Sequence, residues 1–468
     1  MAPLAILTPN DILAIHHATL RILSEVGIVL RDAEARTLLL DHGARELDGR
    51  VCLPPDLVES CVARCPSRVT VQGRGGKAEL GAGEMHVHNL GGARDVLDRA
   101  GGDPRPATTR DLAESARLLD ALENVTTITP LYTPCDVPPS AMTVVMYDQT
   151  IRHTLKPVSA PGVQTVAEVH YLAEMAHIVL GEASAVLLSL SPISPLNFPA
   201  DLAQAIIEIA RQGMPLAPLP CPQAGISAPL SLAGALAQQN AEVLAMITLA
   251  QLVRPGLPML YCGRLAAIDM RSALPIWGNP EIALVSAATV QIGHFYHLPV
   301  NVYGLCGSGH AIDIQNGYER ALNAVVPALA GADELSGIGE MTSGTISSNT
   351  QMVIDNEIMG MVFRIRRGFE VNEDSLAVEV IAQVMASPMH NFLSMPHTVK
   401  YLRGGELWRG KLAIQGIGWE QWRDTGRPTV VERAEAEANR ILSEHEVEPL
   451  PDDQARALDE IIRAAWGQ

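Results

Sequence analysis

The stretch V-N-V-Y-G-L-C-G-S-G-H-A-I-D-I-Q-N-G-Y-E, Val300–Glu319, contains one strand–turn–helix unit. Its apolar, β-branched start predicts a buried strand that ends at the first glycine. A glycine-rich turn follows and carries Cys306, Ser308 and His310. A helical pattern then begins near Asp313, a residue type that often caps helices. The unit therefore predicts a strand with a helix directly after it.

The same unit recurs along most of the chain. Strand-like segments separated by Ala/Leu/Ile-rich helical patterns occur at 126–134, 156–162, 185–192, 214–220, 258–263, 300–307 and 334–340. Strands that alternate with helices predict a parallel sheet. Seven such buried units favour a (β/α)8 TIM barrel over an open sheet. We expect the eighth strand near 366–372.

The flanking segments read differently. The sequence T-P-N-D at 8–11 is typical of a helix start, and residues 50–99 show short alternating strands between glycines. Two further helices are expected at 431–445 and near 452–466. We therefore divide the chain into an N-terminal helical and β-hairpin cap (1–104), a catalytic barrel (105–400) and a helical C-terminal extension (401–468).

Composition excludes several classes of protein. The 34 Lys and Arg and 52 Asp and Glu give a net charge of −18, which disfavours nucleic-acid and anionic-membrane partners. We find neither a basic leader nor an apolar run long enough to cross a membrane. The odd number of cysteines, 7, favours reduced thiols. We expect a soluble cytoplasmic protein, and its apolar helices favour a homo-oligomer.

Working residues of such barrels lie at the carboxyl ends of the strands. Several candidates follow the predicted strands: Tyr132, Cys135, Cys221, Tyr261, Cys262, Tyr303, Cys306, Ser308, His310 and Glu340. Because side chains alternate along a strand, Tyr261 and Cys262 cannot both line one pocket. Each cysteine is also explained as a small apolar filler.

Two kinds of site are disfavoured by the motifs. Zinc sites usually show close ligand pairs, and C-V-A-R-C (61–65) and H-V-H (86–88) have no matching second pair, so we predict no metal site. The G-S-G of the turn is not the nucleophile elbow of a hydrolase. A thiol, a hydroxyl and an imidazole in one turn therefore need another explanation.

Five separated blocks, in order along the chain, resemble the trimethylamine:corrinoid methyltransferase superfamily. They are A-G-I-S-A-P-L-S-L-A-G-A-L-A-Q-Q-N-A-E-V-L-A (224–245), Y-G-L-C-G-S-G-H-A-I-D-I-Q-N-G-Y-E (303–319), D-N-E-I-M (355–359), N-F-L-S-M-P-H-T (391–398) and R-A-E-A-E-A-N-R-I-L (433–442). The resemblance covers most of the chain. It implies a (β/α)8 barrel whose mouth docks a corrinoid protein. The corrinoid (cobalamin) is then carried by that partner, with no cofactor tightly bound to this chain.

One departure from the family changes the implied substrate. The founding trimethylamine enzymes carry pyrrolysine after the sixth strand, and that place corresponds here to about Cys306–Gly307, where ordinary residues stand. Pyrrolysine acts as an imine electrophile that captures an amine lone pair. A quaternary ammonium has no lone pair, and its leaving group is already a neutral tertiary amine. The resemblance thus implies demethylation of glycine betaine or a related betaine.

The implied reaction assigns roles to the candidate residues. Co(I) attacks a methyl carbon in line with the nitrogen, so positioning matters most. We expect catalytic roles for His310 and Glu340. Substrate contacts are expected from aromatic walls, which bind cations at about 0.5–2 kcal/mol per contact, from the turn, and from donors to a carboxylate. These residues are Tyr132, Tyr261, Tyr303, Trp277, Cys306, Ser308, Gln351 and His397.

Two alternatives stay open at this level. One is a zinc/thiolate-type corrinoid methyltransferase that acts on another methyl donor. The other is a catalytically inactive protein that binds a quaternary ammonium ligand. The sequence does not separate glycine betaine, proline betaine, carnitine and γ-butyrobetaine, because they differ in the pocket depth they need.

Overall fold

The N-terminal segment of the computed structural model, which describes residues 3–388 and 390–467, is helical. Helix α1 (Pro9–Arg21) begins at a capping box in which Thr8 and Asp11 bond each other's backbone N–H groups, as the T-P-N-D sequence predicts. A π-helical turn, η1 (Ile22–Val26), continues it. The remaining elements before residue 63 are β1 (Val29–Leu30), α2 (Ala33–Asp41), β2 (Arg45–Leu47), β3 (Arg50–Cys52) and α3 (Pro55–Val62).

A β-hairpin closes one end of the strand set. Strands β4 (Val69–Gln72) and β5 (Lys77–Leu80) pair antiparallel. Their side chains Val69, Val71 and Leu80 are buried against Leu187, Ala217, Leu260 and Cys262. Leu187 and Leu260 directly precede strands β9 (Leu188–Leu190) and β13 (Tyr261–Gly263), so the hairpin fills the amino end of the strands. The carboxyl ends lie on the opposite side.

The seven predicted strands all have parallel neighbours. Strands β13 (Tyr261–Gly263), β16 (Val300–Tyr303), β17 (Glu334–Ile338) and β6 (His86–Asn89) form one sheet in that order. Strand β11 (Leu216–Pro218) pairs with β9 (Leu188–Leu190). Parallel bridges link Leu216 to Met259, Gly162 to Ser189 and Ile128 to Val158. The α/β class with a parallel arrangement is therefore confirmed.

Strand β6 corrects the sequence prediction. Residues 86–89 were expected in the cap, but Val87 lies opposite Leu335 in the parallel sheet. The eighth strand expected near 366–372 is wrong, since α11 (Asn349–Arg367) runs into that segment and irregular chain follows it. The sequence predicts H-V-H-N as a strand but places it in the cap, because it is short and follows a hairpin closely. Its four residues are all buried, as in a strand covered on both faces.

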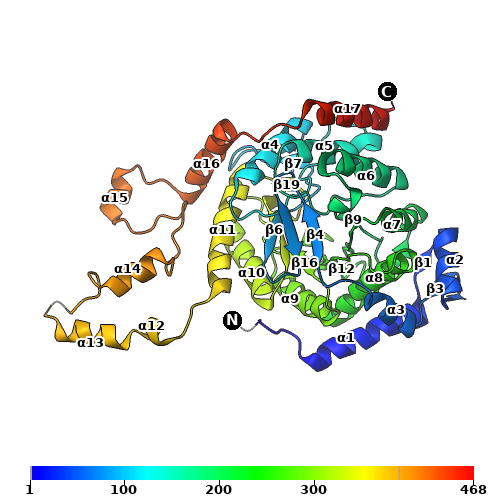
Figure 1. Ribbon diagram of the computed structural model, residues 1–468, viewed down its shortest axis with the longest axis horizontal. Helices are drawn as coiled ribbons and strands as arrows, with labels where there is room; N and C mark the ends of the chain where they lie inside the picture. Colours follow the sequence, from blue (N-terminus) through cyan, green and yellow to red (C-terminus); the bar gives the residue numbers. More distant parts are fainter. Residues whose placement is uncertain (1–2, 389, 468) are drawn as a thin grey trace.

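Helices cover the parallel strands from outside (Figure 1). They are α4 (Thr109–Ala121), α5 (Met142–Arg152), α6 (Val166–Leu180), α7 (Ala200–Gln212), α8 (Leu232–Val253), α9 (Pro280–Phe295), α10 (Ile314–Ala330) and α11. Asp313 caps α10 by accepting a hydrogen bond from the N–H of Asn316 at 3.1 Å, as predicted. None of the helices in the described residues is both long and apolar enough to cross a membrane.

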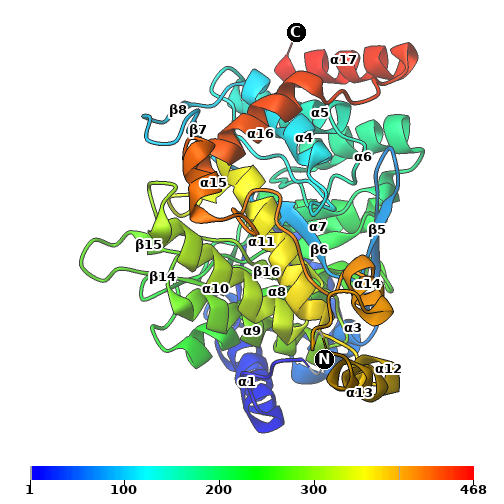
Figure 2. The ribbon, with the colours of Figure 1, turned by 90° about the vertical axis from the view of Figure 1, so that its left-hand side faces the viewer.

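Short strands and 3-10 turns occupy the connecting loops. The 3-10 turns are η2 (Pro139–Ala141) and η3 (Ala183–Ala185). The strands are β7 (Asp95–Val96), β8 (Arg105–Pro106), β10 (Asn197–Phe198), β12 (Gln223–Ala224), β14 (Ala266–Ile268), β15 (Pro275–Ile276), β18 (Glu340–Met341) and β19 (Ile346–Ser347). The β14–β15 hairpin protrudes from the carboxyl-end side of the strands in Figure 2.

The C-terminal part leaves the body and returns to it. Helices α12 (Glu373–Leu376), α13 (Val378–Ala386) and α14 (Pro396–Arg403) extend outward, and α15 (Trp419–Asp424) lies on a second loop (Figures 1 and 2). Helices α16 (Val430–Glu444) and α17 (Asp452–Trp466) match the two predicted helices and pack against α4 and α6. The predicted domain boundary at 400 falls inside α14.

Candidate functional site

Five of the predicted residues meet at the carboxyl ends of β13, β16 and β17. They are Trp277, Tyr303, Cys306, Ser308 and Glu340, which we call the strand-end cluster. Tyr303 ends β16, and Cys306 and Ser308 lie in the turn that follows. Trp277 follows the β14–β15 hairpin, and Glu340 begins β18. Three separate loops therefore contribute to one place.

Aromatic rings form one wall of the cluster. The ring centroids of Trp277 and Tyr303 lie 4.8 Å apart, and Cys306 is buried in the same apolar group. Gly344 lets the indole lie close, because a Cβ there would sit 2.6 Å from the Trp277 ring. The indole Nε1 is buried without a hydrogen-bond partner among the described residues. The cluster thus contains an aromatic pair, in which Tyr303 is buried, and one donor without a partner among these residues.

An arginine that the sequence prediction overlooked also contacts the Tyr303 ring. The Arg264 guanidinium carbon is 4.9 Å from the Tyr303 ring centroid, a cation–π distance. Arg264 is buried and donates to the side chain and backbone carbonyls of Asn301. It directly follows β13, so its place at a strand end was readable from the sequence. A cation already covers one face of Tyr303.

The turn after β16 is held by hydrogen bonds. The Ser308 hydroxyl oxygen accepts from the backbone N–H groups of Trp277 and Gly278, both at 2.9 Å. The N–H groups of Ser308 and Gly309 donate to the Glu319 carboxylate at 2.8 and 3.2 Å. Ser308 therefore positions the tryptophan backbone and is not free to act as a nucleophile.

Glu340 belongs to a buried acid pair with Asp355 around one guanidinium. Its carboxylate accepts from the N–H groups of Gly307 at 3.1 Å and Gly344 at 2.6 Å. Arg320 lies 3.7 Å from Glu340 and 2.9 Å from Asp355, and all three side chains are buried. Burial raises the pKa of Glu340 to about 7 and that of Asp355 to about 6, against the effect of Arg320.

A second polar group lies inside the strands, below the cluster. The Asn301 amide donates to Glu334 and contacts His88 Nε2 at 2.9 Å. Thr127 donates to the other Glu334 oxygen at 2.6 Å. Burial lowers the pKa of His88 and favours its neutral form. Asn301 links this group to Arg264, whose guanidinium donates to it. These hydrogen bonds hold the guanidinium against the Tyr303 ring.

Three other predicted residues, His310, Gln351 and Tyr132, lie outside the aromatic pair of the cluster. His310 is exposed at the rim, where its Nδ1 lies 3.1 Å from the Thr342 hydroxyl. Gln351 donates to Asp355 at 2.8 Å and so touches the acid pair rather than the aromatic wall. Tyr132 is buried near the end of its strand segment, where it bridges to Ala93.

Two predicted residues are not brought to the cluster. The Tyr261 hydroxyl donates to Asn240 of α8 at 2.9 Å, and its ring stacks on Tyr296, so it faces the helices. Strand alternation places Cys262 on the inner face instead. His397 lies on α14, where its ring is 4.4 Å from that of Tyr401. We leave both residues out of the candidate site.

The ion pair between Arg320 and Asp355 lies at the edges of two sequence blocks. Arg320 directly follows the block 303–319, and Asp355 opens the block D-N-E-I-M. In the structure the Arg320–Asp355 ion pair joins them. The residue after one family block and the first residue of another therefore form an ion pair, but nothing in a single sequence indicates which charges pair.

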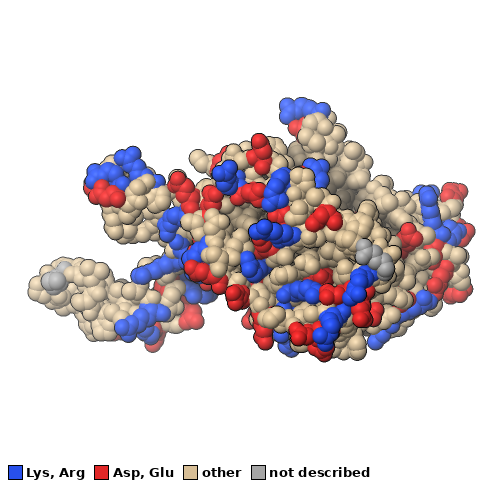
Figure 3. Space-filling view, turned by 90° about the horizontal axis from the view of Figure 1, so that it is seen from above, with Lys and Arg blue, Asp and Glu red and all other residues tan. Residues whose placement is uncertain are grey.

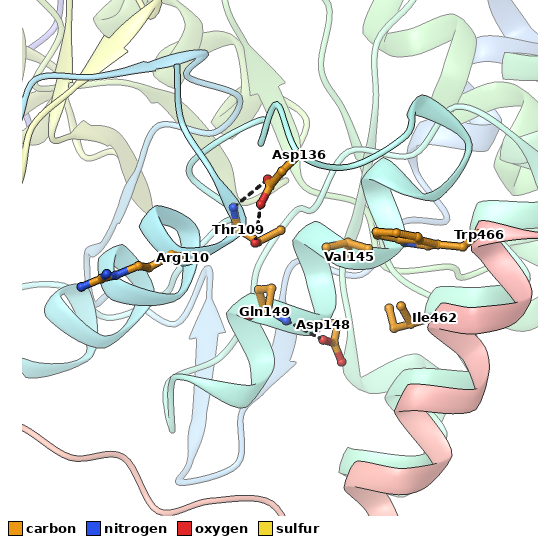
Figure 4. A pocket seen from close by; sticks show the side chains of 8 residues that line it. All are labelled: Thr109, Arg110, Asp136, Val145, Asp148, Gln149, Ile462 and Trp466. Carbon is orange, nitrogen blue, oxygen red and sulfur yellow. Dashed lines mark hydrogen bonds between the residues drawn. The ribbon is translucent and has the colours of Figure 1, made fainter. Parts of the chain in front are cut away.

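A polar hollow of about 370 Å³ lies elsewhere, at the seam of α4, α5 and α17 (Figure 4). Thr109 donates to Asp136 at its edge through its N–H and hydroxyl at 2.9 and 2.8 Å. Trp466 and Ile462 reach it from α17. It contains none of the predicted site residues. Within 3–388 and 390–467, no three His, Cys, Asp or Glu side chains gather as metal ligands would.

Comparison with known proteins gives a consistent result. Residues 1–465 match the family described as "Trimethylamine methyltransferase (MTTB)". The chain is 30% identical over 474 residues to a trimethylamine methyltransferase MttB of Desulfitobacterium hafniense (strain DSM 10664 / DCB-2), covering 98% of this chain and 93% of the relative.

Two further comparisons add to this. A glycine betaine methyltransferase of Desulfitobacterium hafniense (strain Y51) is 30% identical over 406 residues, covering 84% of each chain. Among solved structures, a phospho-2-dehydro-3-deoxyheptonate aldolase of Thermotoga maritima has a TM-score of 0.37 and 12% identity, over 63% of this chain and 74% of that chain. The last likeness is too low to argue from.

Proposed function

Because this chain belongs to the trimethylamine methyltransferase family and is a methyltransferase, we propose that it demethylates a quaternary amine, glycine betaine or a related betaine. The methyl group passes to the Co(I) corrinoid of a partner protein and a tertiary amine remains. The Co(I) electron pair forms the cobalt–carbon bond, and the carbon–nitrogen pair stays on nitrogen. The reaction takes place in the cytoplasm.

The observation that carries the proposal is the pyrrolysine-free turn beside the Trp277–Tyr303 wall. Ordinary residues stand at Cys306–Gly307, so no imine is available to capture a tertiary amine. Burial raises the pKa of the Cys306 thiol well above its usual value, which disfavours a thiolate there. An aromatic wall suits a quaternary ammonium, which needs no activation.

Two donors beside the wall favour a betaine over a simple quaternary amine. The Trp277 indole N–H is without a partner in the described chain, and Arg264 lies over the Tyr303 ring. A betaine carboxylate would satisfy the indole and be attracted by the guanidinium. His310 at the rim is a further donor. The ammonium end is then left facing the carboxyl-end side, where cobalt must approach.

Glu340 is proposed to supply negative charge beneath the substrate. Since burial holds its pKa near 7, a cation nearby lowers that pKa and favours the carboxylate. The substrate charge disappears as the carbon–nitrogen bond breaks. A permanently ionised, exposed carboxylate would stabilise the cationic ground state more than the transition state. A partly protonated Glu340 binds the cation less tightly and reduces that disadvantage.

The proposed fold is the closed (β/α)8 barrel. Its support is that each parallel segment has hydrogen-bonded neighbours on both sides, from Thr126 beside Val87 round to β17 beside β6. Loops at the carboxyl ends carry large exposed apolar side chains, which suit docking of a corrinoid protein. These are Ile226, Leu230, Met270, Leu274 and Ile314.

The test is methyl transfer to Co(I) cobalamin or to a corrinoid protein, followed by the absorbance change at cobalt. We expect methylcobalamin and one equivalent of tertiary amine with a betaine, and none with trimethylamine. Trp277→Phe keeps the ring and removes the N–H, so it should raise the KM for betaines but not for tetramethylammonium. Turnover of trimethylamine alone would contradict the proposal. Tight betaine binding without transfer would favour an inactive binding protein.

A further inference from the structure

Residues 369–403, which contain α12, α13 and α14, form an arm that projects from the body (Figures 1 and 2). In its described residues the arm has almost no core of its own. No residue of α12 or α14 is buried, and Val384 alone is buried in α13. A segment of this kind gains little hydrophobic stabilisation from its own chain.

The exposed surface of the arm is strongly apolar. Residues 380–399 contain no Asp, Glu, Lys or Arg, in a chain with a net charge of −18. The leftmost tip in Figure 3 is accordingly almost wholly tan. The large exposed apolar side chains of the arm are Phe369, Val371, Leu376, Val378, Ile381, Met385, Phe392, Leu393, Val399 and Leu402. A patch of this size on a soluble protein marks an interaction surface.

Hydrogen bonds between its helices nevertheless give the arm a defined structure. Asn372 and Ser375 form a capping box at the start of α12. Asp374 of α12 accepts hydrogen bonds from Lys400 at 2.7 Å and Tyr401 at 2.9 Å, both on α14. His397 contacts the Asp374 carbonyl at 3.0 Å. These bonds fasten α12 to α14, so the apolar side chains are presented in one arrangement.

A mostly apolar hollow of about 680 Å³ lies beside the root of the arm. Arg366, in the last turn of α11, lines it together with Leu13 of α1 and Phe295 of α9. Gly81, Gly83, Gly331 and Asp333 also line it, and they precede β6 and β17. The hollow and the arm root therefore lie at the amino ends of the strands, opposite the strand-end cluster.

We propose that the arm packs against a second copy of this chain and that the hollow at the amino ends of the strands is part of the surface it covers. In a two-fold pair, the surface beside the root of one arm lies nearest to the partner, and each arm reaches the other body. Both unpartnered apolar surfaces of this end of the molecule are then buried together.

A second copy fits this surface better than the corrinoid protein does. Under the proposed function, the corrinoid protein must reach the carboxyl ends of the strands, on the other side. It must also leave after each transfer, and interfaces that open repeatedly are small and polar. The arm is large and apolar, as in permanent interfaces between copies of one chain. The stretch 380–399, which has no charged side chain, also approaches an acidic body without charge repulsion.

The test compares sedimentation of the full-length chain and three variants. Ile381→Glu combined with Leu393→Glu places two charges in the arm, and Leu13→Glu places one in the hollow. Leu47→Glu, on exposed β2, is the matched control. We expect the unaltered chain and the control to sediment as a dimer or larger. The arm variant should raise the dissociation constant about a hundredfold or more and sediment as a monomer. Leu13→Glu should weaken association in the same direction.

Circular dichroism and methyl transfer to free Co(I) cobalamin check that the variants fold. Sedimentation needs neither amine nor corrinoid, so its result stands even if the proposed reaction is wrong. A monomeric unaltered chain at micromolar concentration would overturn the proposal. So would an arm variant that stays a dimer, and above all one that stays a dimer but no longer binds the corrinoid protein.

Discussion

Glu340 and Asp355 at the strand ends, and Asp374 in the arm, are all carboxylates beside a cation. Arg320 lies between the first two, and Lys400 bonds the third at 2.7 Å. Burial raises the pKa of Glu340 and Asp355, while hydrogen bonds from Lys400 and Tyr401 lower the pKa of exposed Asp374. The same chemical groups thus differ in pKa direction because water reaches one set and not the other.

This difference in pKa direction shows which carboxylates can change their charge near neutral pH. In the arm the ion pair is screened and holds two helices together. At the strand ends one guanidinium serves two carboxylates without water, so a proton is retained close to neutral pH. Only the buried group responds to a cation that enters beside it. The following substitutions test how far this contrast holds.

The largest effect is expected for Arg320→Met. It leaves two buried carboxylates without their cation, so the free energy of unfolding should fall by about 3–5 kcal/mol. The matched change is Lys400→Met, which removes the exposed cation of Asp374 and should leave the urea midpoint almost unchanged. Urea unfolding followed by fluorescence measures both. Equal losses of unfolding free energy in the two variants would contradict the difference between the buried and the exposed carboxylates.

The next effect is the pH dependence caused by Glu340. Its folded pKa of about 7 lies above the unfolded value of 4.5, so its stabilisation is complete below pH 4.5 and is lost as pH rises through about 7. The loss amounts to about 3 kcal/mol at about 1.4 kcal/mol per unit of pKa. Glu340→Gln removes this slope. Urea midpoints of both proteins between pH 5 and pH 8 should therefore diverge, and parallel curves would contradict the raised pKa.

A smaller effect is expected for Ser308→Ala. The N–H groups of Trp277 and Gly278 lose their acceptor, which lowers the free energy of unfolding by about 1–2 kcal/mol. The displaced indole should also raise the KM for betaines with less change in kcat. Thr398→Val removes a hydroxyl that donates to the Phe392 carbonyl in the arm, and it is the control. A lowered kcat with unchanged KM would show that Ser308 acts in the chemical step.

The smallest effect is expected for Asp374→Asn. The carboxylate is exposed and its pKa is lowered, so any stabilisation is present above its unfolded pKa and is lost as pH falls through the folded value. Solvent screens this interaction. The thermal midpoint at pH 7 should not change measurably, and a sizeable drop would contradict solvent screening of the Asp374–Lys400 pair.

Sequence patterns predicted the repeating parts of the molecule well. Seven parallel segments, the α1 and α10 caps and the two last helices follow from local periodicity and capping residues, which neighbouring positions record. Strand β6 was expected as a strand of the cap, and its place in the parallel sheet was missed because it follows other short alternating strands. Its partner β17 lies far away in the chain, and local sequence patterns do not indicate which distant strands pair.

The candidate site was predicted only in part for the same reason. Residues at strand ends, such as Tyr303, Ser308 and Glu340, are found from strand boundaries alone. Arg320 and Asp355 lie inside helices, where charged residues usually face water, so their burial follows only from packing. Tyr261 was misplaced because the face of a strand depends on register, and His397 because the arm leaves the body after α11.

The β4–β5 hairpin has a consequence for the order of events in a reaction cycle. Since it fills the amino end of the strand set, the amine and the cobalt of the proposed function both reach the site from the carboxyl end. The small substrate then binds first, and the docked corrinoid protein blocks its way out of the site. The demethylated amine departs only after that protein has gone, so an ordered kinetic sequence follows from two short strands far from the reacting atoms.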